Sequence, residues 1–569
     1  MSEINAAPNR VTAAIRKHPL LILFTLCLIA WLPGFFTIPP LDRDESRFAE
    51  ASKQMLETRN FIDIRFGREP RYKKPVGIYW LQAAATEAAS PLTHGARDRI
   101  WTYRIPSLIG ALAAVALTFR LAAAFLDVET AFLSALLLGL TILLGAEAKI
   151  AKTDAALLAT VIGAQGALLR AYLARDPDQP RLTFFGAMLG WLSFALGVLI
   201  KGPVILGVCG ATVLALVLWD RKWRWLGALR PLRGLLLTAI VVAPWLVAIA
   251  LQSHGAFYQQ SLGHDFAAKL AGGQESHGEP PGYYLLMTTI TFWPATLFLA
   301  PAIAAAIASR AQPAARFLLA WAGACWLLFE LVPTKLPHYV LPVYPALAVM
   351  SAAFVSAPPG AGSSFRRRAL TALSTVHFLA GAAILAAGVV ILPRLYGPGV
   401  SPELFGLAAT IAAVSLLAGG LALAGRRGAA AALATLAAIV ATSTLTMAVM
   451  PKLDRFWVSP REAELVAAHR RSGDPPPALA GYTEPSAMFL IGSSTRLTDG
   501  AGAAEIGAAE GGLALIEDGQ RGRFLARLAE LEADATPIDS LAGFNYSRGR
   551  PVRITLYRVS PARGPAPGK

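Results

Sequence analysis

The chain has 569 residues, of which 55% are hydrophobic and only 15% are charged. A soluble protein of this length would carry about 25% charged residues, so the composition excludes that class and indicates a polytopic membrane protein. The formal net charge is +16, but the basic residues gather in short loops, where they fix topology and meet anionic lipid. We therefore predict membrane lipids as partners and no nucleic acid.

Apolar runs of close to twenty residues predict about thirteen transmembrane helices. A shorter apolar segment at 76–90 is typical of a helix that lies along the interface or enters it partway. The fold class is thus a polytopic α-helical membrane protein. The predicted spans are 19–37, 105–125, 129–148, 152–173, 182–199, 203–219, 234–251, 286–308, 315–332, 338–355, 370–393, 403–424 and 428–450.

Lys and Arg in the short loops alternate cleanly through these spans, which places the N-terminus and the basic loops on the cytoplasmic side. The loops 38–104 and 252–285 and the tail then lie outside. The three cysteines, Cys27, Cys209 and Cys325, all sit in apolar runs and form neither a disulfide framework nor a zinc ligand set.

Two domains follow from this organisation. Residues 1–450 form the transmembrane domain, including an external amphipathic loop at 38–104. Residues 451–569 alternate strand-like and helix-like patterns, such as "PVRITLYRV" and "GRFLARLAELEA", and predict a soluble α/β domain.

The first external loop begins with "DRDESRFAEASKQM" (42–55). Asp42 and Glu45 have the spacing of a capping box, and Phe48 and Met55 belong to one apolar face. We predict an amphipathic helix that lies on the outer membrane surface.

Further charged residues stand close to the spans, and all of them fall on the external side. Charges at such depth are costly and usually functional. Lysines and arginines beside tyrosines suit a lipid phosphate, and acids among them suit a base or a group that orients an acceptor. The residues are Arg71, Lys73, Lys74, Glu147, Lys149, Lys152, Asp154, Lys201, His264, Asp265, Lys335, His338 and Tyr339.

These residues also carry a family resemblance. "LDRDESRFAEASKQMLETRNFI" and "YKKPVGIYWLQA" resemble the first external loop of the aminoarabinose (lipid A) transferase-like family of GT-C glycosyltransferases, which is related to the protein O-mannosyltransferases. "AKTDAALL", "LIKGPV" and "KLPHYVLPVYPALA" resemble further blocks of that family in the same order.

The resemblance implies a GT-C fold with about thirteen helices and a periplasmic C-terminal domain. It implies an enzyme that moves a pentose or hexose from an undecaprenyl-phosphate-linked donor to an outer-leaflet glycolipid, lipid A or lipopolysaccharide core. It also implies an active site at the periplasmic face. The Ala, Gly and Arg bias of the composition suggests a bacterium with a GC-rich genome and hence an inner membrane, where we expect the protein to be a monomer.

The resemblance also assigns roles to residues. Asp44 matches the acid of the Asp-Glu motif and is the first catalytic candidate, together with its neighbour Glu45 and with Asp154. Lys74 matches a lysine that contacts the carrier phosphate. The substrate-binding candidates are Arg47, Lys74, Lys201, Lys335 and Tyr339.

One departure concerns a metal. The family's loop usually reads Glu-Lys-Pro-Pro, but here Lys73 takes the place of the glutamate, and a lysine cannot replace a carboxylate that helps to bind a metal. We assign no cofactor and keep His264 as the single weak candidate for a divalent metal site.

Alternatives remain open at this stage. The same donor chemistry onto a protein hydroxyl differs only in the acceptor. A membrane transporter would place its ionisable groups near the middle of the membrane rather than at one edge. In the tail, Glu484 and Tyr546 either cap the chamber or belong to an ordinary strand-turn motif.

Overall fold

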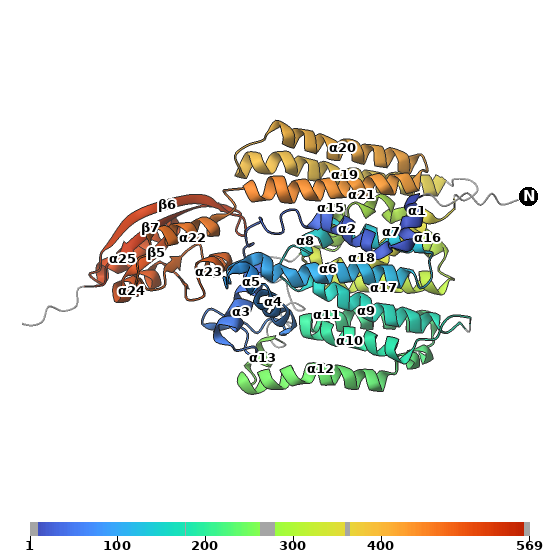
Figure 1. The fold of residues 1–569 in the computed structure, drawn as a ribbon, viewed down its shortest axis with the longest axis horizontal. Helices are drawn as coiled ribbons and strands as arrows, with labels where there is room; N and C mark the ends of the chain where they lie inside the picture. The colour runs from blue at the N-terminus through green and yellow to red at the C-terminus, as the bar shows by residue number, and fades with distance from the viewer. Residues whose placement is uncertain (1–9, 177, 262–278, 359–364, 563–569) are drawn as a thin grey trace, which may run out of the picture.

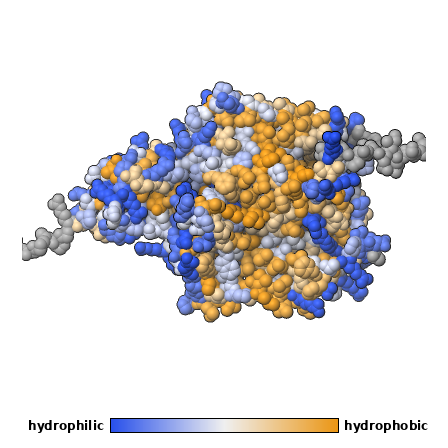
Figure 2. All heavy atoms as spheres, in the orientation of Figure 1, coloured by the Kyte–Doolittle hydropathy of each residue, from blue (hydrophilic) through white to orange (hydrophobic). Residues whose placement is uncertain are grey.

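The computed structural model describes residues 10–176, 178–261, 279–358 and 365–562. A bundle of long helices makes up most of the molecule, and a smaller domain built on a sheet projects from one end of it (Figure 1). Figure 2 shows a broad apolar band across the visible face of the bundle, with hydrophilic residues at both of its ends. The predicted fold class, a multi-pass membrane protein with a small C-terminal domain, is confirmed.

Ten helices in the described residues are long and apolar enough to span a membrane, and a bent pair adds an eleventh. The pair is α15 (Tyr283–Thr291) and the segment Ala295–Ala308, which meet at 117°. The ten are α6 (Ile100–Ala122), α9 (Asp154–Leu173), α10 (Phe184–Lys201), α11 (Pro203–Asp220), α12 (Pro231–Gln252), α17 (Pro313–Leu331), η4 with α18 (Pro337–Ser356), α19 (Phe365–Tyr396), α20 (Pro402–Leu423) and α21 with its extension (Arg427–Lys452).

The two remaining predicted spans fall on shorter apolar helices, α2 (Pro19–Trp31) and α7 (Val128–Gly139). α7 ends before its predicted limit of 148, because Thr141 starts a new short helix, α8 (Ile142–Glu147), by accepting a hydrogen bond from the Leu144 amide. The predicted interfacial segment is α4 (Gly77–Ala88), which packs on α6.

The helix predicted at 42–55 exists as α3 (Asp44–Thr58), but the prediction that it lies on the membrane surface is wrong. α3 packs between α4 and α23 (Pro485–Ile491) of the C-terminal domain, so both of its faces are buried. On the polar face, Lys53 donates from Nζ to the Phe489 carbonyl at 2.9 Å. Sequence periodicity cannot reveal that a second domain covers the polar face.

The C-terminal domain holds a five-stranded sheet in the order β4-β3-β5-β7-β6, where β3 is parallel to its two neighbours and β7 is antiparallel to its own. Apolar clusters pack on both faces of the sheet. The elements are α22 (Val458–His469), β3 (Ala478–Ala480), α23, β4 (Arg496–Thr498), α24 (Gly500–Glu510), β5 (Gly512–Glu517), α25 (Asp518–Glu530), β6 (Ala535–Asn545) and β7 (Arg550–Val559). The predicted boundary at 450/451 falls inside the short helical turn Met450–Lys452, and the division itself stays a prediction.

A buried ion pair ties the first external loop to the bundle. Arg104 of α6 donates from Nε and Nη2 to the Glu45 carboxylate at 2.8 and 2.9 Å, and both side chains are at most 1% exposed. The remaining Arg104 donors bond the carbonyls of Phe35, Ile38 and Pro39. Glu45 also accepts from the Leu41 and Ala151 amides, so it does not form the predicted capping box.

Removing the arginine should therefore destabilise the protein strongly. In Arg104→Ala, Glu45 is left as a buried, unpaired charge, which typically costs about 3–5 kcal/mol. We expect the free energy of unfolding in detergent to fall by that amount. Arg99→Ala is the matched control, because its side chain is 63% exposed beside Asp98 and such pairs contribute at most about 1 kcal/mol. Equal losses in the two variants would contradict this role for Arg104.

Candidate active site

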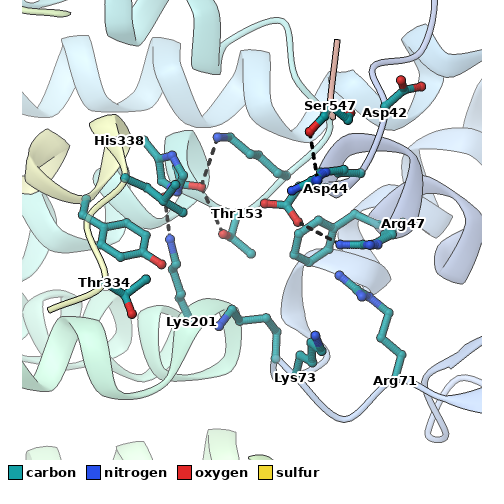
Figure 3. Close-up of a pocket in the computed structure, with 17 residues that line it drawn as sticks. Asp42, Asp44, Arg47, Arg71, Lys73, Thr153, Lys201, Thr334, His338 and Ser547 are labelled. Atoms are coloured by element: carbon teal, nitrogen blue, oxygen red, sulfur yellow. Dashed lines mark hydrogen bonds and ion pairs between the residues drawn. The ribbon is translucent and has the colours of Figure 1, made fainter. Parts of the chain in front are cut away.

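A polar cavity of about 420 Å³ opens at the end of the bundle where the C-terminal domain docks. Its wall contains seven basic and three acidic side chains, which is a strongly cationic balance. Figure 3 shows Asp44, Arg47 and Arg71 on one side of the cavity, Lys201 and His338 on the other, and Lys73 between them. The charged residues are Asp42, Arg43, Asp44, Arg47, Arg71, Lys73, Lys74, Lys152, Asp154 and Lys201.

One side of the cavity is an interlocked set of charges around Asp154, the first residue of α9. Lys201, at the end of α10, donates from Nζ to Asp154 at 2.6 Å. Lys152 bonds Glu147 at 2.8 Å and lies 3.9 Å from Asp154, and His338 Nε2 also lies 3.9 Å away. Asp154 is only 6% exposed and pairs with two lysines, so the arrangement favours a role in fixing these lysines over the predicted catalytic role.

Asp44 dominates the other side and has a different environment. Its side chain is 55% exposed to the cavity, and the nearest ion-pair partner is Arg47 at 4.0 Å, one turn along α3. Arg71 lies over the Phe48 ring at 5.2 Å, which holds its guanidinium beside the same space. Asp44 is the acid in this wall that a ligand can reach.

The charges around Asp44 set its ionisation. Partial burial alone would raise the pKa of Asp44, but Lys152, Arg71 and Arg47 outweigh burial and hold the pKa below its ordinary value. Asp44 is therefore a carboxylate at neutral pH, able to accept a proton or to orient an acceptor. Asp42 behaves oppositely, since burial raises its pKa to about 7.

The structure brings most of the predicted site residues together. Asp44, Arg47, Lys74, Asp154, Lys201 and Tyr339 all line the cavity, and Lys201 lies over the Tyr339 ring at 5.4 Å. Their predicted roles stay predictions.

Two of the predicted site residues lie elsewhere. Glu45 does not line the cavity, and its carboxylate is occupied by Arg104 and two amides, so the arrangement favours a structural role over the predicted catalytic one. Lys335 is buried and donates to the Glu279 carbonyl at 2.9 Å, next to the cavity but outside its wall.

Sequence reasoning missed Ser547, which reaches the wall from the C-terminal domain. It also missed Arg104, although an arginine inside the apolar run "IWTYRIPSLIG" is a signal for a buried partner. His264 lies outside the described residues. Within the described ranges, no group of three or more His, Cys, Asp or Glu residues is arranged to hold a metal ion.

Comparisons with known proteins identify the fold class of the chain. The family model for dolichyl-phosphate-mannose-protein mannosyltransferases matches residues 73–247. The fold is similar to the crystal structure of ArnT from Cupriavidus metallidurans, with a TM-score of 0.71 in the apo state and 0.72 in the structure bound to undecaprenyl phosphate. Each of these matches has 16% sequence identity and covers 95% of this chain and 98% of that one. The protein therefore has the GT-C fold.

Sequence relatives narrow the comparison. The chain is 27% identical over 376 residues to the undecaprenyl phosphate-α-4-amino-4-deoxy-L-arabinose arabinosyl transferase of Edwardsiella ictaluri, a match that covers 66% of this chain and 64% of that protein. The enzyme of the same name from Pseudomonas aeruginosa is 27% identical over 337 residues, which is 58% of either chain. The matches thus span somewhat less than two thirds of these relatives. The resemblance to aminoarabinose transferases of the GT-C class is confirmed.

The low pKa of Asp44 predicts a pH profile. The reference pKa of an aspartate is about 3.9. An aspartate whose pKa is lowered therefore stays ionised down to a pH below that value. We expect titration of Asp44 to contribute no acid limb to the rate between pH 5 and pH 7, because its carboxylate stays ionised throughout that interval. The measurement is the pH dependence of the rate in the wild type and in Asp44→Glu. A fall in the rate on acidification with an apparent pKa between 5 and 7, which Asp44→Glu shifts, would contradict a lowered pKa at Asp44.

Proposed function

We propose that the protein is a glycosyltransferase that moves a sugar from a polyprenyl-phosphate carrier to a lipid acceptor at the external membrane surface. The observation that carries the proposal is the cationic cavity with one accessible carboxylate, Asp44, at the mouth of a GT-C bundle. The relatives' printed names, and the neighbour crystallised with undecaprenyl phosphate, favour undecaprenyl phosphate as the carrier.

A second cavity supports the lipid carrier. This smaller space, of about 230 Å³, shares Lys73, Lys74 and Lys201 with the main cavity. From these cations it continues among apolar side chains of α10, α11 and α12, including Leu199, Leu206, Val242 and Trp245. A phosphate at the lysines with its prenyl chain along these side chains satisfies both halves of an amphipathic donor.

The reaction follows from these positions. The bond between the sugar's anomeric carbon and the carrier phosphate breaks, and the phosphate leaves as a monoester with added negative charge. Lys74, Arg47 and Lys201 stabilise that charge, an effect worth about 10²–10³ in rate per donor group. An acceptor oxygen bonds to the anomeric carbon, and Asp44 takes its proton when the acceptor is a hydroxyl. When the acceptor is a phosphate, Asp44 only orients it.

We propose a glycolipid acceptor, lipid A or lipopolysaccharide core, in the outer leaflet of a bacterial inner membrane. The N-terminus is then cytoplasmic, the C-terminal domain is periplasmic, and the protein works as a monomer. A protein hydroxyl as acceptor is the alternative. The transporter hypothesis is disfavoured, because Asp154 is the first residue of α9 and Lys201 the last residue of α10, so the ionisable cluster lies at one end of the bundle and not midway along it.

The central role of Asp44 is directly testable. Asp44→Asn keeps the shape of the side chain but removes the base, and positioned bases contribute about 10²–10⁴ in rate. We expect formation of the glycosylated lipid in membranes to fall by at least about 10², with unchanged protein level. Asp98→Asn, an exposed external acid, serves as the control. Near-normal product from Asp44→Asn would reject the assignment.

A second comparison separates two predicted phosphate ligands. Lys74 lines both cavities, whereas Lys335 donates to a backbone carbonyl outside them. We expect Lys74→Met to weaken undecaprenyl phosphate binding by about tenfold, the effect of losing one charge-assisted hydrogen bond. Lys335→Met should leave the dissociation constant unchanged. The opposite ranking, measured with the purified proteins, would contradict the location of the phosphate.

A further inference from the structure

The loop that carries Asp44 makes contacts with the C-terminal domain that the reaction itself does not require. Asp42, two residues earlier, is 9% exposed, and its carboxyl oxygens contact that domain. In Figure 3 its carboxylate points away from the other labelled side chains of the cavity.

Three hydroxyl groups of the C-terminal domain surround Asp42. The Ser486 hydroxyl, in the first turn of α23, donates to the carboxylate, and the Tyr482 hydroxyl donates to it at 3.3 Å. The Asp42 amide in turn donates to the Tyr546 hydroxyl at 2.6 Å. We call Tyr482, Ser486 and Tyr546 the Asp42 clamp.

The clamp is itself rigidly held. Ser486 also bonds Ser459 at 2.7 Å, and the Tyr546 ring packs against Phe456 and Trp457 at 5.4 and 6.4 Å between centroids. The domain that carries the clamp is anchored by Phe489, whose ring meets Tyr103 of α6 edge to face at 5.4 Å. The hydroxyls are therefore fixed relative to the transmembrane bundle.

Arg43 connects the clamp to Asp44 through a strained backbone. Its φ is 61° and its ψ is −109°, a combination that L-residues rarely adopt. Such conformations persist only where the surroundings over-determine them. Here the clamp holds the preceding residue, Arg43 Nη2 donates to the Ser547 carbonyl at 2.9 Å, and Glu45 is locked to Arg104 on the far side.

We propose that the Asp42 clamp positions Asp44, so that the C-terminal domain acts as a positioning element of the active site. With both neighbours of Asp44 fixed, one to each domain, the carboxylate is held in the cavity although its own contacts are few. Without the clamp, Arg43 relaxes toward an ordinary conformation and turns the first residue of α3 away. The effect on turnover rests on the proposed function, whereas the contact itself does not.

Two conservative substitutions test the proposal in the full-length protein. Tyr546→Phe keeps the ring contacts and removes only the hydroxyl, and Ser486→Ala removes one donor to Asp42. The matched control is Tyr557→Phe, a buried tyrosine on the opposite face of the sheet. Three quantities are measured: amide hydrogen exchange of residues 39–48, the dissociation constant of undecaprenyl phosphate, and the yield of glycosylated lipid.

For each clamp variant we expect faster exchange at 41–45 and a product yield lowered by about tenfold, the cost of a modest misplacement of a reacting group. Binding of undecaprenyl phosphate should stay unchanged. Asp42→Ala should lower the yield as well, and adding Ser486→Ala to it should cause no further loss, because the serine acts through Asp42.

Unchanged exchange and unchanged yield in both clamp variants would overturn the proposal. So would a loss of binding and yield that Tyr557→Phe shares, since this indicates general destabilisation. If the Tyr546→Phe protein does not accumulate in the membrane, the exchange and yield measured for Ser486→Ala test the proposal in the same way. A wild type that forms no glycosylated lipid, while exchange still responds to the clamp variants, rejects the proposed function and supports the clamp.

Discussion

The buried pair of Glu45 and Arg104 is the constraint on which the rest of the site depends. It joins the start of α3 to α6 and uses every N–H donor of the guanidinium. Each oxygen of the Glu45 carboxylate accepts two hydrogen bonds, from Arg104 and from a backbone amide. A buried charge is tolerated only when it is paired and hydrogen-bonded in this way. The pair thus sets where α3 begins, and the next residue back, Asp44, is left facing the cavity.

The cavity combines two kinds of carboxylate. Asp154 is enclosed by Lys201, Lys152 and the ring of His338, an arrangement that favours a role in holding the two lysines in place. Asp44 is accessible and has a single distant partner, Arg47. Nearby cations lower the pKa of Asp44. A ligand in the cavity can reach the Asp44 carboxylate, which is 55% exposed, whereas the Asp154 carboxylate is 6% exposed. The proposed reaction would use both, the fixed positive charge for the leaving phosphate and the reachable acid for the acceptor.

Hydropathy alone predicted the helical spans, because about twenty apolar residues are needed to cross a bilayer. The external clustering of charge predicted a phosphate site with Lys74 and Lys201, and the family resemblance added Asp44 to it. The sequence did not reveal that the polar face of α3 is buried, because that face is covered by α23, which follows about 430 residues later in the chain. For the same reason Glu45 was kept as a catalytic candidate beside Asp44, its neighbour in the motif. Their different environments depend on Arg104, which binds Glu45 and lies 59 residues later in the chain.

The central claim is that this chain transfers a sugar from a lipid carrier to a lipid. Mass spectrometry of lipid A, core glycolipid and undecaprenyl-linked lipids, from a deletion strain and from the same strain complemented with the intact gene, tests it most directly. The account predicts that one glycolipid loses the mass of one sugar in the deletion strain, while the sugar-charged carrier accumulates, and that complementation restores both. Identical lipid profiles in the two strains would contradict it.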